Sequence, residues 1–350
     1  MINDESFTIK DVERIYLTLG MNCNFNCKYC YQSEDKNKPL YTELKNVSTN
    51  IIEYIKNISK ETNKTLNLMF WGGEPFIYFN TIKSVVENLK DENISFSIVT
   101  NGSLLTKEKV DFINKNNISI GISHDGKNTY ITRKNDILNN KEILELIKKI
   151  NDLSIVTVFS AYNFDLLETT EYYKEKIGRE VSVNLEWLHC DNNTDESLYK
   201  FDKDIVQEKL LIFLKRIEQD LLCGEYSNRI NTLYQFLYQS QNNNNNKIPY
   251  CMQVRKCVNI DLAGNVTACH PYGKLGTIFD NHEELIKKYD EKYNIAFDFD
   301  DCKNCKWINE CKAGCPLEYP CSGKKAMCEI KAIFYETIKN FLNKSVIING

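Results

Sequence analysis

The chain has 350 residues, of which 42% are hydrophobic and 26% are charged, a composition typical of a soluble globular protein. Its formal net charge is −4, with lysines and acids mixed along the chain, which argues against a nucleic-acid partner. The first ten residues are polar and no apolar run approaches the roughly 20 residues of a membrane span, so we expect a cytoplasmic protein with no membrane partner.

Six short β-rich apolar runs alternate with amphipathic stretches, and each run ends near a turn signal. The predicted strands are residues 14–19, 66–71, 95–100, 119–123, 153–159 and 181–188. Alternating strands and helices favour a parallel sheet, and six units are too few to close an eight-stranded barrel. The sequence therefore predicts an α/β fold with a partial (β/α)6 TIM barrel, whose open side would admit a peptide.

Two more helices are predicted over residues 204–222 and 228–240, before an asparagine-rich loop at residues 241–246. Most of the fourteen cysteines then lie between residues 251 and 328, where we expect a second domain. The predicted parts are a barrel over residues 1–203, a helical linker with the loop over 204–249, and a cysteine-rich domain over 250–343. Because cytosolic thiols stay reduced, metal or redox chemistry explains these cysteines better than disulfides.

A loop with three cysteines follows the first predicted strand. Cys23, Cys27 and Cys30 form a C-x3-C-x2-C pattern, with Tyr29 before the last cysteine. Three thiolates hold three irons of a 4Fe-4S cluster and leave the fourth iron open to a ligand. A structural zinc loop is the alternative, but zinc prefers four protein ligands and no fourth lies near.

Further motifs follow strands two to four. They are Gly72-Gly73-Glu74-Pro75, Thr100-Asn101-Gly102 and Ser123-His124-Asp125-Gly126. Each motif alone is an ordinary turn, but their order after the cysteine loop resembles the radical S-adenosylmethionine (SAM) superfamily. In that superfamily the open iron binds SAM.

The resemblance implies a set of SAM contacts. Gly72, Gly73 and Glu74 would receive the amino group, and Thr100 and Asn101 would complete the site at the next strand end. Ser123 and Asp125, which strand alternation puts on one side with His124 on the other, would contact the ribose. Arg133 would pair with the carboxylate, and Tyr29 would lie near the adenine.

The later cysteines follow a second pattern. Cys251 is followed by twelve residues, Gly264, four residues and Cys269, and a C-x2-C-x5-C-x3-C run then extends from Cys302 to Cys315. This resembles the SPASM domain of peptide-modifying radical SAM enzymes, which binds two auxiliary 4Fe-4S clusters. The implied ligands are Cys251, Cys257, Cys269 and Cys315 for the first cluster, and Cys302, Cys305, Cys311 and Cys328 for the second, with Cys321 as the alternative to Cys328.

Two other interpretations of the cysteines stay open. A pair of zinc ribbons would also use C-x2-C units. The isolated Cys190 and Cys223 are predicted to be core residues and not ligands.

The two resemblances together imply an enzyme with three 4Fe-4S clusters and SAM. Reductive cleavage of SAM would give a 5′-deoxyadenosyl radical that takes hydrogen from a peptide or protein, and an auxiliary cluster would accept the remaining electron. The expected product is a thioether or carbon–carbon crosslink in a ribosomally made peptide. Formylglycine formation by an anaerobic sulfatase maturase is one alternative, and a non-catalytic electron-transfer protein is another.

The expected partners are an electron donor such as flavodoxin or ferredoxin and, for a peptide maturase, a separate recognition protein. Two histidines are candidates for the site. His270 stands where sulfatase-maturing enzymes have an acidic base, and it could serve as a base near neutral pH or only pack at the hairpin end. His189 ends the sixth strand and could face the substrate.

Overall fold

A single sheet organises the protein. The computed structural model describes residues 7–32, 47–225, 227–241, 254–269, 272–293, 302, 304–311, 314–315 and 321–344. The sheet has nine strands in the order β6-β5-β4-β3-β2-β1-β7-β8-β9. They are β1 (Arg14–Thr18), β2 (Leu66–Trp71), β3 (Ile94–Thr100), β4 (Ser119–Ser123), β5 (Leu153–Phe159), β6 (Ser182–Trp187), β7 (Cys257–Asp261), β8 (Asn265–Cys269) and β9 (Tyr272–Thr277). Strands β1 to β6 are parallel neighbours, which confirms the predicted partial barrel.

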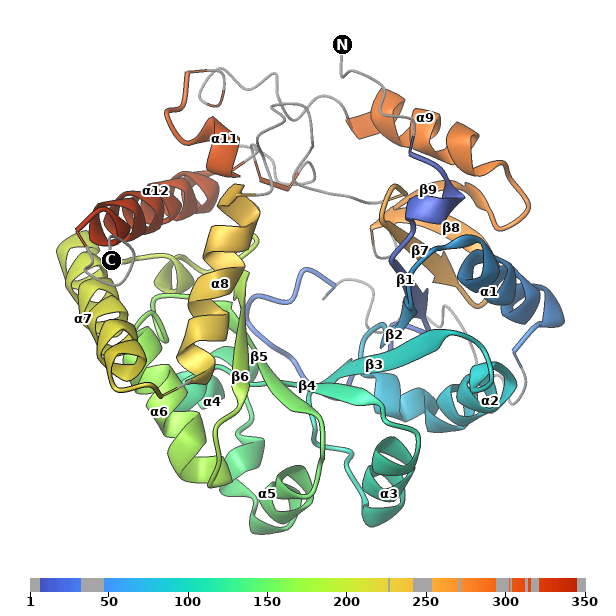
Figure 1. Cartoon of the computed structure of the whole chain (residues 1–350), viewed down its shortest axis with the longest axis horizontal. Coiled ribbons are helices and arrows are strands. Elements are labelled where there is room, and N and C mark those ends of the chain that lie inside the picture. Colours follow the sequence, from blue (N-terminus) through green and yellow to red (C-terminus); the bar gives the residue numbers. More distant parts are fainter. Residues whose placement is uncertain are drawn as a thin grey trace.

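Helices cover the outer side of the curved sheet, as Figure 1 shows for α1, α2, α3, α5 and α6. The helices are α1 (Thr49–Glu61), α2 (Phe79–Leu89), α3 (Lys107–Lys115), α4 (Thr129–Arg133), α5 (Lys141–Lys148), α6 (Leu166–Ile177), α7 (Lys203–Leu222), α8 (Asn228–Gln241), α9 (His282–Tyr293), α11 (Ile308–Cys311) and α12 (Ser322–Leu342). Short 3₁₀ helices cover Ile9–Asp11, Pro75–Tyr78, Gly126–Asn128, Ile137–Asn139 and Glu196–Leu198. Among the described helices, none has the length and apolar character needed to span a bilayer.

The helices form where apolar residues recur with helical spacing and where a polar side chain caps the first turn. Helix α1 turns Ile51, Ile55 and Ile58 inward, and all three are buried. Full burial of one such side chain stabilises the fold by about 1.5–3 kcal/mol. Helix α6 begins where Asp165 accepts a hydrogen bond from the Glu168 amide and ends at Gly178, which has a left-handed φ of 80°.

The C-terminal hairpin continues the barrel sheet. Strand β7 pairs in parallel with β1, with Arg14 opposite Cys257 and Thr18 opposite Asp261. Strands β7 and β8 are antiparallel, and Gly264 in the turn between them has a φ of 78°. Nothing in the sequence indicated that this hairpin would join the barrel sheet.

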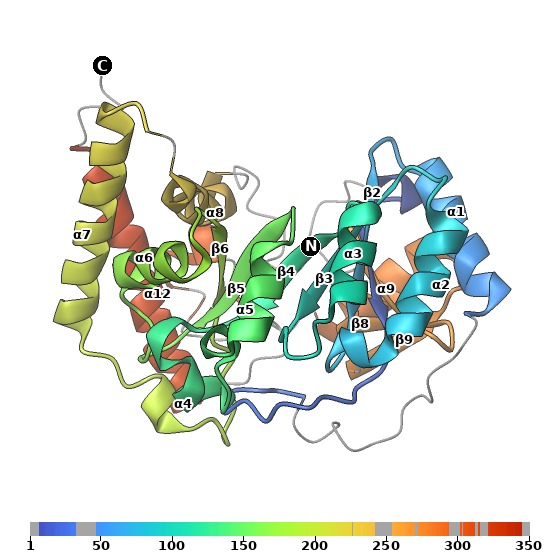
Figure 2. The ribbon, with the colours of Figure 1, turned by 90° about the horizontal axis from the view of Figure 1, so that it is seen from below.

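The last helix returns to the other end of the molecule. Helix α12 packs against α7, and Figures 1 and 2 both show the two helices side by side. Their contact belongs to a second apolar cluster, which contains Phe213 and Leu214 of α7 and Phe334 of α12 together with Phe159 of β5. The cysteine-bearing helix is therefore anchored to the barrel through its own core.

Candidate functional site

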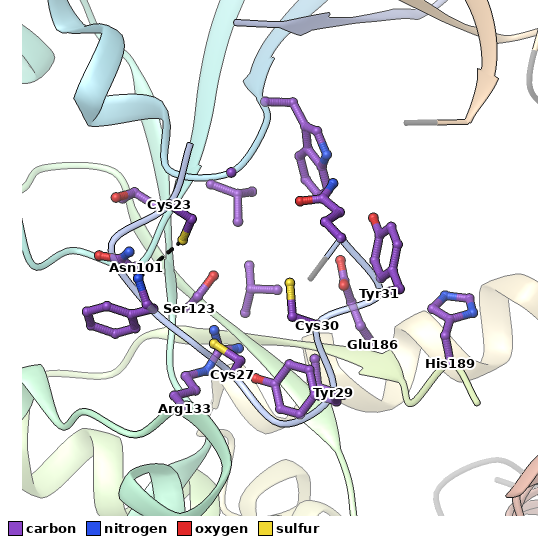
Figure 3. Close-up of a pocket in the computed structure, with 18 of the residues that line it drawn as sticks. Cys23, Cys27, Tyr29, Cys30, Tyr31, Asn101, Ser123, Arg133, Glu186 and His189 are labelled. Atoms are coloured by element: carbon purple, nitrogen blue, oxygen red, sulfur yellow. Dashed lines mark hydrogen bonds between the residues drawn. The ribbon is translucent and has the colours of Figure 1, made fainter. Parts of the chain in front are cut away.

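One cavity lies at the carboxyl ends of the barrel strands. It is lined by the cysteine loop after β1 and by residues at the ends of β2 to β6, and Figure 3 shows these side chains converging from separate elements. The lining residues on which the site depends are Cys23, Cys27, Tyr29, Cys30, Tyr31, Gly72, Gly73, Thr100, Asn101, Ser123, Arg133, Glu186, Trp187 and His189. The cavity holds about 940 Å³ of empty space, counting the part open to solvent. Parallel strands bring their carboxyl ends to one edge, which explains why motifs distant in sequence meet here.

The two glycines after β2 allow the cysteine loop to lie directly against them. The Gly73 amide donates to the Gly20 carbonyl at 2.9 Å, and the Glu74 amide donates to the Asn22 carbonyl at 2.8 Å. A Cβ at Gly72 or Gly73 would collide with the backbone of residues 20–22, and Gly72 has a φ of 140°. The Gly-Gly pair therefore fixes the position of the cysteine loop.

The Glu74 carboxylate does not belong to the cavity lining. It is 1% exposed and accepts hydrogen bonds from the Phe76 amide at 3.0 Å, the Thr100 hydroxyl at 2.6 Å and the Asn101 amide at 2.8 Å. Burial raises its pKa, although these hydrogen bonds oppose that effect. The side chain ties the end of β2 to the end of β3, and the contact of Glu74 with the SAM amino group stays a prediction.

Asp125 lies beneath the cavity at the centre of a polar network. The Arg133 guanidinium donates to it through Nε at 3.0 Å and Nη2 at 3.2 Å, and the Tyr29 hydroxyl donates to Oδ2 at 2.6 Å. Thr132, Thr157 and the Val158 amide also donate to this carboxylate. Because these donors surround both oxygens, Asp125 holds Arg133 and Tyr29 in place. The sequence had instead predicted that Asp125 would contact the ribose of SAM.

Burial pushes the pKa of Asp125 upward, but Arg133 and the hydrogen bonds more than offset it, so the pKa lies below its usual value. We expect Asp125→Asn to lower the free energy of unfolding by about 3–5 kcal/mol, because Arg133 would remain buried without its counter-charge. Since the folded-state pKa is lowered, this stabilisation is present above a pH of about 4 and is lost as the pH falls further. Urea unfolding at pH 7 and pH 3 measures both effects, and equal stability of the two proteins at pH 7 would contradict the assigned role.

Ser123 and His124 point to opposite sides, as strand alternation predicted. Ser123 lines the cavity. The His124 ring is buried on the other side, where its nitrogens lie 3.4 Å from the Tyr173 hydroxyl and 3.1 Å from the Asp136 carboxylate. Burial lowers its pKa despite Asp136, so this histidine is a structural residue.

Cys23, Cys27 and Cys30 all line the cavity, and Figure 3 shows the three side chains around the same space. Across the described residues, no three His, Cys, Asp or Glu side chains are close enough to hold a single metal ion. The three soft thiolate donors around one cavity fit an iron–sulfur cluster with one open iron.

Four of the described C-terminal cysteines lie near one another. Burial raises the pKa of the Cys311 thiol to about 11. The charge of Lys331 acts to lower this pKa, whereas the thiols of Cys328, Cys302 and Cys305 act to raise it. These four cysteines therefore lie within electrostatic reach of one another, and they are the set that the SPASM resemblance implies for the second auxiliary cluster.

Cys321 has a different environment. Its sulfur accepts a hydrogen bond from the Lys324 amide at 3.3 Å and so caps the first turn of α12. It packs with Cys190 in the apolar cluster that joins α12 to α7. These contacts favour Cys328 over Cys321 as the fourth ligand. Cys190 is buried as expected, but Cys223 is exposed, so its predicted core position is wrong.

Tyr31 connects the two halves of the site. Desolvation raises the pKa of Tyr31 well above its usual value, and the nearby Cys269, Glu186, Cys30 and Cys315 groups add to the shift. Cys269 and Cys315, two implied ligands of the first auxiliary cluster, thus lie near Tyr31 in the loop that carries Cys30. Cys257 lies elsewhere on the same hairpin, near Arg14 and Tyr16. Cys251, the remaining implied ligand of this cluster, lies outside the described residues. So does His270, the candidate base.

Glu186 is a site residue that the sequence prediction missed. Its carboxylate is in the open part of the cavity where water reaches it, yet the surrounding protein raises its pKa, opposed by His189 and Arg133 and aided by Asp125. His189 also lines the cavity, and its ring meets that of Tyr31 edge-on at 6.1 Å. Side chains two residues apart on a strand share one side, so Glu186 lies on the same side as Leu188, which also lines the cavity. The sequence offered no motif that would single out Glu186.

Comparisons with known proteins agree with this site. The model of the radical SAM superfamily matches residues 17–181. The radical SAM cyclopropyl synthase TigE of Paramaledivibacter caminithermalis is 27% identical over 338 residues, covering 88% of this chain and 68% of TigE. The cysteine-type anaerobic sulfatase-maturating enzyme of Clostridium perfringens is 27% identical over 333 residues, covering 84% of this chain and 85% of that enzyme.

A solved structure shares the fold. It is described as "Native anSMEcpe with bound AdoMet and Cp18Cys peptide", and it superposes with a TM-score of 0.69 at 21% identity, covering 94% of this chain and 99% of that one. At this level of identity the likeness concerns the fold alone.

Proposed function

Because this chain is a radical SAM enzyme, with a radical SAM domain over residues 17–181, we propose that it installs an oxidative crosslink in a ribosomally made peptide. The observation that carries the proposal is the single cavity in which Cys23, Cys27 and Cys30 meet the strand-end motifs, with implied auxiliary-cluster ligands beside it. Similarity to a sulfatase-maturating enzyme over 84% of this chain supports a reaction on a peptide or protein. The proposal includes three 4Fe-4S clusters, of which the first binds SAM.

The chain's own residues fit these cofactors. Cys23, Cys27 and Cys30 would hold the first cluster, and Arg133, fixed by Asp125, would meet the SAM carboxylate at the cavity wall. Ser123, Thr100 and Asn101 line the same wall, and the Gly72-Gly73 turn keeps the cysteine loop in place. When bound, the cofactors supply a 5′-deoxyadenosyl radical that takes one hydrogen atom from a carbon of the peptide.

A crosslink removes two hydrogens from the peptide. After the first leaves as an atom, the second would leave as a proton and an electron when the new bond forms, and an auxiliary cluster held by the C-terminal cysteines would supply the acceptor for that electron. The site therefore needs a proton acceptor that can reach the peptide. Glu186 suits this role, because its carboxylate lies in the cavity and its raised pKa makes it a stronger base than an ordinary glutamate.

Formylglycine formation is the second candidate, supported by the similarity to the sulfatase-maturating enzyme over 84% of this chain. His270 replaces the acidic base that this reaction would be expected to use, and Glu186 is an acid that could replace it. The two reactions differ in the mass that they remove from the peptide. A non-catalytic electron carrier, the third candidate, would not cleave SAM.

The test is mass spectrometry of short peptides encoded beside the gene, incubated with the reduced protein and SAM. We expect a loss of about 2 Da for one crosslink, since two hydrogens leave, against about 18 Da for conversion of Cys to formylglycine. Formation of 5′-deoxyadenosine is followed in the same samples. A loss of 18 Da would replace the proposal with the second candidate, and absence of SAM cleavage would leave the electron carrier.

A further inference from the structure

A buried lysine lies on the C-terminal helix. Lys331 of α12 is 7% exposed, and among the described residues the structure gives its ammonium no ion pair. Lys306, by contrast, is exposed and pairs with Glu336 at 2.9 Å. A buried ammonium without an anion nearby is costly, so an anion is expected beside Lys331.

The surroundings offer one set of groups that can be anionic, the thiols of Cys302, Cys305, Cys311 and Cys328. The residues that follow Cys305 pack against the same part of α12, where the Trp307 ring lies 5.7 Å from the Tyr335 ring and Lys306 pairs with Glu336 at 2.9 Å. Cys328 also precedes Lys331 by three residues on α12, and residues with this spacing lie close together on a helix surface. The influence of Lys331 on the Cys311 thiol agrees with this placement. The buried charge therefore lies beside the segments that carry the four thiols for which the SPASM resemblance implies a cluster.

The same ammonium touches the cavity wall. Its Nζ lies over the Trp187 ring, 5.5 Å from the centroid. Trp187 lines the cavity and packs edge-on against Phe334 of α12 at 5.3 Å and Phe159 of β5 at 5.2 Å. An aromatic cluster thus holds Lys331 against the cavity wall, and a Trp face is a favourable surface for a cation.

We propose that Lys331 sets the reduction potential of the cluster held by Cys302, Cys305, Cys311 and Cys328, and raises it. Reduction adds one negative charge to a centre that thiolates already make negative. A fixed buried cation stabilises that charge far more than an exposed lysine does, since the protein interior screens charge weakly. The inference rests on the part of the proposed function that places an iron–sulfur cluster at these thiols. It gives this cluster, the one coupled to Trp187, the character of an electron acceptor.

The test is a potentiometric titration followed by electron paramagnetic resonance on the anaerobically purified full chain. The Cys23, Cys27 and Cys30 to Ala background simplifies the spectrum to the C-terminal clusters. We expect Lys331→Met to lower one of their midpoint potentials by at least about 59 mV, a tenfold change in the one-electron reduction constant. Lys331→Arg keeps the charge and should keep the potential near that of the parent. Lys339→Met, an exposed lysine on the same helix, should leave both potentials unchanged.

Unchanged potentials in Lys331→Met would overturn the inference, as would an equal shift in Lys339→Met. Zinc in place of iron at these thiols would overturn it as well. Lys331→Arg separates loss of charge from loss of packing, because a variant that merely disturbs the core would shift the potential whatever charge it carries. The titration contains no peptide, so failure to find a crosslinked product cannot be mistaken for failure of this inference.

Discussion

Replacement of Cys23, Cys27 and Cys30 together by alanine should lower the iron content of the anaerobically purified protein from about twelve to about eight atoms per chain, with the sulfide content falling in parallel. Cleavage of SAM should be lost completely. The reason is local, because these three thiols line the cavity at the strand ends, whereas the implied auxiliary ligands that the structure describes come from β7, β8 and the segments that follow β9.

The same variant should keep its fold. The cysteine loop is held by backbone hydrogen bonds to the Gly72-Gly73 turn, which alanine at the three cysteines leaves intact. Cys223→Ala is the matched control, since that thiol is exposed at the end of α7 and should affect neither iron nor SAM cleavage. Iron that stays at about twelve atoms, or zinc without sulfide in the parent protein, would contradict the assignment of a cluster to this loop.

Glu186→Gln should reduce the amount of crosslinked peptide formed per 5′-deoxyadenosine at least 100-fold, the lower end of what general base catalysis contributes. Glutamine has nearly the shape of glutamate but cannot accept the proton that leaves when the bond forms. The measurement is the ratio of modified peptide to 5′-deoxyadenosine by mass spectrometry and chromatography. This ratio separates proton removal from radical formation, which a simple rate would combine.

The pH profile gives an independent check. The base acts when deprotonated, so in the parent protein the ratio should fall as the pH drops through the pKa of Glu186, which the surrounding protein raises above its ordinary value. Groups from several elements interact electrostatically with this carboxylate: His189 from the end of β6, Arg133 from α4, Asp125 from the end of β4, Tyr31 from the cysteine loop and Tyr16 from β1.

In Glu186→Gln the acid limb should disappear together with the activity. His189→Gln removes a side chain that lowers the pKa of Glu186, so it should instead move the limb to higher pH and leave product. Glu208→Gln on the exposed face of α7 is the matched control for loss of one carboxylate. A ratio in Glu186→Gln equal to that of the parent would show that the proton leaves by another route.

Much of the barrel could be predicted from the sequence, because its strands are short apolar runs with turn signals at both ends. The predicted range 66–71 is β2 itself, and 181–188 contains β6. The prediction that Ser123 faces the cavity and His124 faces away from it was also correct, because side chains on a strand change sides at every residue.

Other features depend on contacts that no local pattern encodes. Asp125 points to the predicted side but is enclosed by Arg133, Tyr29 and Thr132, which reach it from another helix and from the cysteine loop. Spacing alone could not separate Cys328 from Cys321, because the difference lies in what each sulfur contacts in three dimensions. Glu186 was missed because a single acid in an apolar strand has no motif around it.

The parallel pairing of β1 with β7 has a consequence for how the protein can diverge. Strand β1 leads directly into the cysteine loop, and β7 begins at Cys257, opposite Arg14. The offset between the cysteine loop and Cys257 is therefore set by strand register and not by the length of chain that separates β1 from β7. Insertions and deletions in the loops between those strands would leave this offset unaltered, because the backbone ladder from β1 to β7 maintains it.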